Sequence, residues 1–168
     1  MTYGTEKVGA NRYREVLGRD YEDFQVGDIY EHRPGRTLLQ ADNTWFTLLT
    51  MNTHPVHFDL NFAAAAEFEK PLMNSTLTLA LVTGMSVSDT SQRAIANLGW
   101  DKVRLIAPVF EGDTLYAESE VLSKRVSRSR PGQGIVTIRT TGINQDDVPV
   151  INFERSFLIA QRTESTSQ

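Results

Sequence analysis

The sequence predicts an α+β fold in which one antiparallel sheet wraps around a single buried helix. Residues 74–90 (NSTLTLALVTGMSVSDT) carry apolar side chains on nearly every side of a helix, yet they are too few to cross a membrane. That segment must therefore lie inside the protein. Much of the chain after residue 100 alternates apolar and polar residues and is rich in β-branched ones, as strands are. Short turns join these segments, which favours antiparallel pairing.

The elements before the central helix are predicted from local signals. Residues 1–20 are polar, show no clean period, and are expected to form a flexible or loosely docked leader. An extended segment lies near residues 29–37. Apolar residues at helical spacing between Trp45 and Leu49 predict a helix with Asp42 as its N-cap and Trp45 and Phe46 in the core. Asp59 is a second N-cap candidate, for an alanine-rich helix that ends before Pro71.

Four extended segments follow the central helix, at 101–110, 113–127, 134–144 and 149–162, and turn residues separate them. A helix followed by such a meander predicts one hot-dog domain over residues 21–162, with a polar tail at 163–168. The open edge of such a sheet is commonly covered by an identical subunit. We therefore expect a homodimer or a higher homo-oligomer.

Composition excludes several classes of protein and of site. The 168 residues suit one domain with a real core, and the net charge of −4 does not favour nucleic acid or an anionic membrane as a partner. The absence of cysteine excludes disulfides, thiolate metal sites and a cysteine nucleophile. The polar N-terminus lacks the apolar core of a signal peptide. A cytoplasmic protein is expected.

The stretch MNTHPVHFD at residues 51–59 holds two of the three histidines, His54 and His57. Taken alone, it is typical of a turn stiffened by Pro55. A metal site is a second interpretation, since two histidines three residues apart can bind one metal ion. However, no carboxylate or thiolate in a recognisable motif accompanies the pair. A reactive centre is the third interpretation.

Longer motifs favour the third interpretation. The segments YEDFQVGD, HPVHFD with FAAAAEFEKPLMNSTLTLALVTG, and APVFEGDTLYAESEV resemble the MaoC-like dehydratases, the family that includes the (R)-specific enoyl-CoA hydratases. The resemblance spans roughly residues 20–162, and its second segment is the distinctive one. It implies a hot-dog fold and an acyl-CoA thioester substrate, with no cofactor and no metal.

The resemblance also implies the site residues. The family pairs a carboxylate with a histidine five positions later; the histidine falls on His57, but the carboxylate position holds Asn52. The segment Asn74, Ser75 and Thr76 matches the family's oxyanion segment, where a glycine is usual and Ser75 stands here. Thr83 falls where the hydratases keep a hydroxyl, and His54 is expected to be structural or to line the pocket.

Hydration of an enoyl thioester needs a base near neutral pKa beside the water, and histidine suits this best. It also needs donors at the thioester oxygen, which the free N–H groups at the start of the central helix offer. Asn52 cannot accept a proton. We therefore expect His57 to carry the proton alone, while Asn52 holds the water.

A basic loop is a weaker candidate for binding. Arg128 and Arg130 precede the turn in VSRSRPGQG. Each taken singly is more typical of a solvated hairpin. Guanidinium groups suit phosphate well, so one of them, or Lys124 or Arg125, is a candidate for a coenzyme A phosphate.

The leading hypothesis is a hydro-lyase that interconverts a 2-enoyl-CoA and a 3-hydroxyacyl-CoA, with a small, branched or dicarboxylic acyl group such as mesaconyl-CoA. One alternative is a hot-dog acyl-CoA thioesterase, although no carboxylate lies between Asn74 and Ser88 to serve it. The other is a non-catalytic acyl-CoA-binding homologue, because Asn52 replaces the usual carboxylate.

Overall fold

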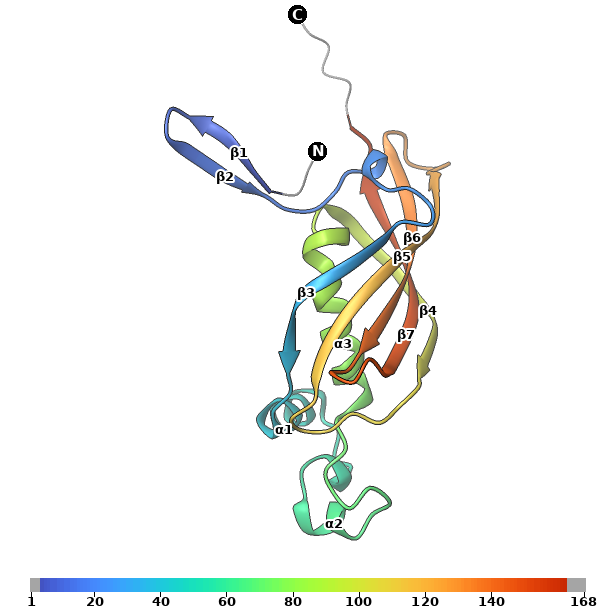
Figure 1. Ribbon diagram of the computed structural model, residues 1–168. Helices are drawn as coiled ribbons and strands as arrows, with labels where there is room; N and C mark the ends of the chain where they lie inside the picture. The colour runs from blue at the N-terminus through green and yellow to red at the C-terminus, as the bar shows by residue number, and fades with distance from the viewer. Residues whose placement is uncertain (1–3, 163–168) are drawn as a thin grey trace, which may run out of the picture.

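The computed structural model describes residues 4–162 and confirms an α+β hot-dog fold. Five antiparallel strands form one sheet in the order β3-β5-β6-β7-β4, and the sheet curls around helix α3 (Figure 1). The strands are β3 (Ile29–Thr37), β4 (Ala94–Leu105), β5 (Thr114–Val126), β6 (Gln133–Ile143) and β7 (Pro149–Ala160). The predicted extended segments match four of these. β4 begins seven residues before the expected residue 101, because its register shifts break the alternation there.

The central helix α3 (Ser75–Ser86) continues as a π-helical turn, η3 (Val87–Ser91). Leu77 and Val82 on its inner face are buried against β5 and β6. The opposite face carries the small residues Thr76, Ala80 and Gly84, which are exposed. The helix is thus covered by the sheet on one side and open on the other.

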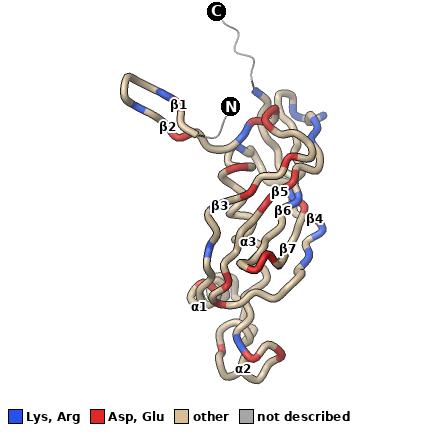
Figure 2. Tube along the Cα trace, in the orientation of Figure 1, with Lys and Arg blue, Asp and Glu red and all other residues tan. Residues whose placement is uncertain are grey.

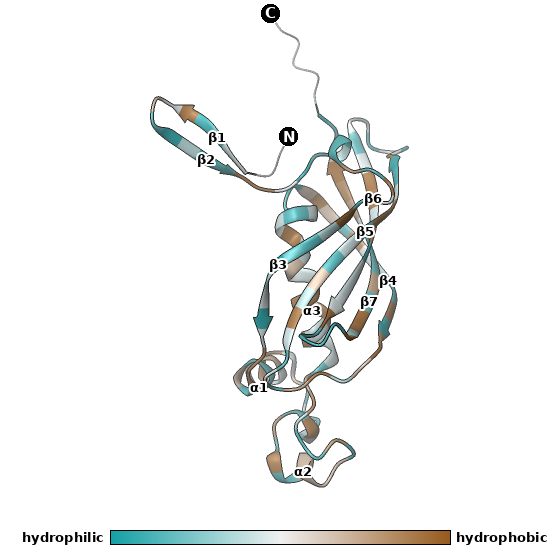
Figure 3. Ribbon diagram, viewed as in Figure 1, coloured by the Kyte–Doolittle hydropathy of each residue, from teal (hydrophilic) through white to brown (hydrophobic). Residues whose placement is uncertain are grey.

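Strands β5, β6 and β7 alternate buried and partly exposed residues, as Figure 3 shows by their alternating hydropathy. The inward residues form two hydrophobic clusters. One cluster contains Leu77, Val82 and Phe153, and the other contains Phe24 and Phe157. A core of this kind gains roughly 25 cal/mol for each Å² of apolar surface removed from water.

A belt of buried polar side chains separates the two clusters. On β7, Arg155 lies between Phe153 and Phe157, and on β5, Ser119 lies between buried apolar neighbours. Arg155 donates to Ser86 Oγ at 2.9 Å and Thr90 Oγ1 at 3.2 Å, at the end of the central helix. His32 Nε2 shares a hydrogen bond of 2.8 Å with Ser119 Oγ. No local sequence pattern predicts this belt.

The belt predicts a pH-dependent stability. The pKa of His32 is lowered to about 4: burial is the main cause, Asp89 opposes it, and the cations Arg155, Arg33 and Arg19 add to it. In the unfolded chain the His32 imidazole binds a proton near pH 6.5, whereas in the folded chain it does not. The free energy of unfolding therefore has its full value above pH 6.5 and decreases as the pH falls toward 4. We expect the loss to reach about 3 kcal/mol.

Urea unfolding of His32→Gln at several pH values tests this prediction, because glutamine does not titrate. The free energy of unfolding of the variant should change less than that of the wild type between pH 6.5 and 4. His54→Gln, at an exposed position, is the control and should keep the wild-type slope. Equal slopes in His32→Gln and the wild type would contradict the role given to His32.

The segment between β3 and α3 forms the narrow end of the molecule (Figure 1). It contains α1 (Gln40–Thr50), the 3-10 turn η2 (Pro55–His57) and α2 (Leu60–Ala64). Asp59 caps α2 as predicted, accepting from Phe62 N at 3.0 Å. Asp42, however, is not the N-cap of α1. It lies in the first turn and accepts from Leu39 N at 3.0 Å, because the helix begins two residues before it.

Helix α1 buries its polar face, contrary to the prediction that Trp45 lies in the core. Asn43 and Thr47 are buried, whereas Trp45 is 67% exposed and Leu49 is 80% exposed. Phe46 is partly buried against the larger cluster. The helix turns this way because Asn43 satisfies backbone groups of the neighbouring segments.

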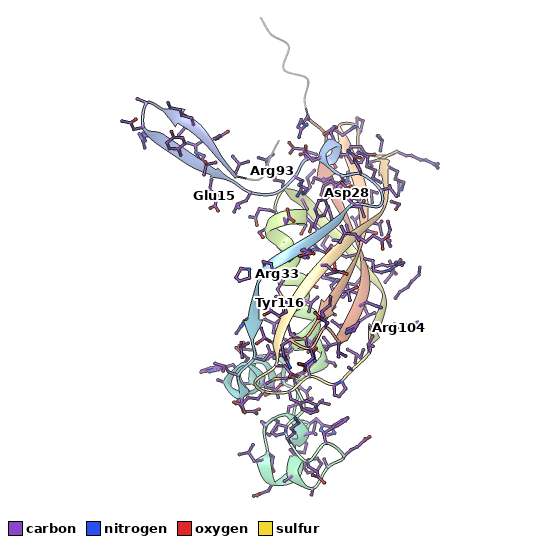
Figure 4. The ribbon with its side chains drawn as sticks, viewed as in Figure 1. Glu15, Asp28, Arg33, Arg93, Arg104 and Tyr116 are labelled. Carbon is purple, nitrogen blue, oxygen red and sulfur yellow. The ribbon has the colours of Figure 1, made fainter. Side chains whose placement is uncertain are left out.

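The N-terminal segment forms a hairpin that the sequence analysis did not predict. β1 (Gly4–Gly9) pairs with β2 (Arg12–Val16), and no residue of either strand is buried. The hairpin extends away from the body, with Glu15 on it and Arg93 at its root (Figure 4). Arg93 Nε donates to Leu17 O at 3.1 Å, which fixes the hairpin's base. The predicted tail at 163–168 lies outside the described residues.

Candidate functional site

The histidine segment begins where α1 ends. Met51 adopts a left-handed conformation (φ 56°), and Asn52 N donates to Thr47 O at 3.1 Å, which closes the helix. Asn52 Oδ1 then accepts from His54 N at 3.0 Å. This local bond is an Asx turn, and it occupies the side-chain oxygen of Asn52. The Asn52 side chain is half-buried, so its amide group remains available to a ligand beside the turn.

The His57 ring is held in one tautomer by the backbone. Its Nδ1 lies 2.8 Å from Leu72 O. A carbonyl oxygen can only accept, so Nδ1 carries the proton and Nε2 carries the lone pair. The ring is half-buried, and Nε2 makes no hydrogen bond within the described residues. His57 therefore presents a base.

The His54 ring has a different role. It is exposed, and its Nδ1 accepts from Val56 N at 3.3 Å, so it stabilises the turn. Its ring centroid lies 5.9 Å from that of His57 and 6.0 Å from that of Phe62. These contacts agree with a structural role beside the site, the first of the two that the sequence analysis allowed.

A buried asparagine joins the histidine turn to the start of α3. Asn43 Nδ2 donates to His57 O at 2.7 Å and to Leu72 O at 3.0 Å, and Asn43 Oδ1 accepts from Asn74 N at 2.9 Å. The side chain is fully buried, so water cannot replace these bonds. Asn43 thus fixes the position of the histidine turn relative to the start of α3, and we call these three hydrogen bonds the Asn43 clamp.

The start of α3 is capped by Asn74, whose Oδ1 accepts from Thr76 N at 2.9 Å and from Thr76 Oγ1 at 2.6 Å. The Thr76 hydroxyl is therefore used by the cap. The Ser75 N–H donates to no acceptor among residues 4–162, and Ser75 is exposed. An N–H group at the positive end of a helix dipole is a suitable donor for a developing oxyanion.

A cleft opens beside Ser75, between the start of α3 and the strand ends. The lining residues carry no ionisable side chain; they are Phe68, Leu72, Met73, Ser75, Thr78, Leu105, Ile106, Ala107, Pro108, Val109 and Val150. A second, largely apolar hollow lies at the end of α1 and is lined by Leu48, Met51, Asn52 and Phe58 among others. His57 lines neither surface itself; its ring is bonded to Leu72, which lines the cleft, and its chain neighbour Phe58 lines the hollow.

The other predicted site residues lie apart from this group. Thr83 is eight residues beyond Ser75, about 12 Å along the helix, and its hydroxyl accepts from Trp100 Nε1 at 3.3 Å. Arg128 and Arg130 lie in the exposed β5–β6 loop, at the end of the sheet opposite α1 and α2 (Figure 1). Within one chain, neither arginine lies at the His57 end of the molecule.

Asn43 is the residue of the candidate site that sequence reasoning missed. The only signal was a polar residue in a helix whose other side is apolar, and that pattern is typical of a solvated face. Its partners are 14 and 31 residues away in the chain, and no local pattern reveals them.

Between residues 4 and 162, no group of three or more histidine, aspartate or glutamate side chains is placed to hold a metal ion. Over the same range, every helix is too short or too polar to span a bilayer.

Known proteins match this chain over most of its length. The family described as mesaconyl-CoA hydratase matches residues 9–168. A mesaconyl-CoA hydratase of Cereibacter sphaeroides is 32% identical over 145 residues, which cover 86% of this chain and 42% of that protein. The chain thus spans less than half the length of this curated relative.

Solved structures show the same fold. An unliganded (R)-hydratase, PhaJ1 of Pseudomonas aeruginosa, superposes with a TM-score of 0.73 at 25% identity, covering 91% of this chain and 95% of that one. A Mycobacterium tuberculosis protein with a double hot-dog fold superposes with a TM-score of 0.81 at 26% identity, covering 90% of this chain and 47% of that one.

Proposed function

The chain belongs to the MaoC-like mesaconyl-CoA hydratase family, and from this membership we propose that it adds water reversibly to a 2-enoyl-CoA thioester. One observation carries the proposal. The tautomer of His57 is fixed by Leu72 O, so that a basic Nε2 faces away from the backbone near the start of α3. The sequence analysis assigned the base to this residue.

The proposed reaction uses this base and the helix start together. His57 Nε2 takes a proton from water, and the water oxygen forms a bond to C3 of the enoyl group. The C2–C3 π electrons shift toward the thioester carbonyl, whose oxygen gains negative charge that the Ser75 N–H stabilises. The enolate then collapses, and the His57 imidazolium returns the proton to C2. No net proton is gained or lost by the protein.

Asn52 supports this reaction without taking part in the proton transfer. Its oxygen is used by the Asx turn, and its NH₂ group is a donor only. In this proposal the NH₂ group binds the oxygen of the attacking water. His57 is then the only group that changes its protonation state during catalysis.

The partner of this chain is proposed to be a second copy of itself. The small residues Thr76, Ala80 and Gly84 leave one face of α3 open, and the edge strand β4 exposes Ile95, Leu98 and Trp100. A neighbour built as a double hot-dog protein supports this pairing. Light scattering should give twice the mass of the chain, or a higher multiple, and the mass of a single chain would contradict the proposal.

An assay with crotonyl-CoA and mesaconyl-CoA tests the activity. Loss of the enoyl absorbance without release of free coenzyme A is the expected result. Release of free coenzyme A would instead indicate a thioesterase. Binding without either change would indicate the non-catalytic homologue.

A further inference from the structure

The segment that builds the site contains a single cation. Between residues 37 and 92, Lys70 is the only lysine or arginine. In Figure 2 the connection beside α2 carries blue next to red stretches. Lys70 lies in the connection from α2 to α3, two residues before Leu72, whose carbonyl holds His57. Lys70 therefore lies close in the chain to the carbonyl that holds the proposed base.

The ammonium group of Lys70 is placed by aromatic rings. Its Nζ lies 3.9 Å from the centroid of Phe110. The Phe110 ring meets the Phe68 ring edge to face, with centroids 5.6 Å apart, and Phe68 lines the cleft. A ring face attracts a cation without neutralising its charge. Lys70, which is exposed, is therefore held beside the part of the cleft that Phe68 lines, with its charge open to an anion from solvent.

Within the described part of the chain, Lys70 has no carboxylate partner. Among residues 4–162, no carboxylate oxygen lies within 4.0 Å of Lys70 Nζ, whereas Arg36, at the other side of α1, is paired with Asp42. Arg104 lies on the edge strand β4 and donates to Val103 O at 3.0 Å (Figure 4). Lys70 thus differs from Arg36 and Arg104, because within the described residues it has neither an anionic nor a carbonyl partner.

We propose that Lys70 binds an anionic group of the thioester substrate at the mouth of the cleft. This inference rests on the proposed function. The cleft lining has no ionisable side chain, so a carboxylate or phosphate that enters must be neutralised at the rim. Two parts of the substrate have this chemistry: a second carboxylate on the acyl group, and a phosphate of coenzyme A. A lysine ammonium suits both, as a point charge with three donors.

Four substrates distinguish the two sources. Mesaconyl-CoA carries both anions, crotonyl-CoA only the phosphates, mesaconyl-pantetheine only the carboxylate, and crotonyl-pantetheine neither. The variant is Lys70→Met, which keeps an unbranched apolar stem against Phe110. Lys70→Arg is the rescue variant, and Arg104→Met is the matched control at an exposed position on β4.

The expected result is a rise in KM of about tenfold for the substrates that carry the bound anion, which is the size expected for losing a charged hydrogen bond. A rise for both mesaconyl esters and neither crotonyl ester assigns the carboxylate. A rise for both CoA esters and neither pantetheine ester assigns the phosphate. In each case KM for crotonyl-pantetheine and kcat should stay unchanged, and Lys70→Arg should restore most of the affinity.

Three results would overturn the proposal: an unchanged KM for all four substrates, an equal rise that includes crotonyl-pantetheine, or an equal effect of Arg104→Met. Thermal unfolding of each variant shows whether the fold is kept. If the wild type hydrates none of the four, the proposed function fails, and calorimetric binding of the same compounds still decides whether Lys70 holds the anion.

Discussion

Replacement of His57 by glutamine is expected to lower kcat for enoyl-CoA hydration by about 10²- to 10⁴-fold, the contribution typical of one general acid–base group. The bonds from Gln40 and Asn43 to the backbone His57 O do not depend on the side chain, so the turn should keep its shape. What glutamine lacks is a basic nitrogen at the position of Nε2. KM should change little, because the imidazole is needed for proton transfer rather than for binding.

The control for His57→Gln is the neighbouring histidine. His54→Gln removes an exposed ring whose Nδ1 only accepts from Val56 N, and its kcat should stay within a few fold of the wild type. Thermal unfolding of both variants separates a lost base from a lost fold. Hydration at the wild-type rate by folded His57→Gln would exclude His57 as the base.

Replacement of Asn43 by leucine is expected to have the largest combined effect on stability and activity. Leucine fills a similar volume but leaves the buried Asn74 N–H without its acceptor, and it removes one donor from each of His57 O and Leu72 O. Those two carbonyls keep Gln40 Nε2 and His57 Nδ1 respectively. An unpaired buried group costs about 1–3 kcal/mol, so a total loss of about 2–4 kcal/mol is expected.

The same change should also lower kcat at temperatures where the variant remains folded, since the base and the helix start lose their common support. Urea unfolding measures the first effect, and the hydration assay measures the second. Asn61→Leu is the control, because Asn61 is exposed on α2 and its loss should cost less than about 0.5 kcal/mol. Equal stability of the two leucine variants would contradict the clamp.

Most of the fold can be predicted from local patterns in the sequence. The central helix was predicted because apolar residues surround it, and β5 to β7 because one face of each is buried and the period of two is clean. The N-terminal hairpin was missed because neither strand is buried, so no alternation marks it. The orientation of α1 was wrong because its apolar residues, such as Trp45, face outward in the single chain.

Some features of the candidate site can likewise be predicted from the sequence, and others cannot. Asn74, Ser75 and Thr76 could be placed at a helix start from sequence, since an asparagine before an apolar run is a strong cap signal. The tautomer of His57 depends on a carbonyl 15 residues away, and the clamp of Asn43 depends on contacts across three segments. Lys70 is visible in the sequence, but its position over Phe110 is a tertiary contact.

The central claim is that His57 alone moves the proton, and the pH dependence of kcat tests it most directly. We predict a single ionisation: the rate rises as the imidazole loses its proton and then stays level, and this limb disappears in His57→Gln. Asn52→Asp should leave the limb in place, since a carboxylate can keep the Asx turn with His54 N. A bell-shaped profile in the wild type, or a limb that survives in His57→Gln, would show that another group shares the proton transfer.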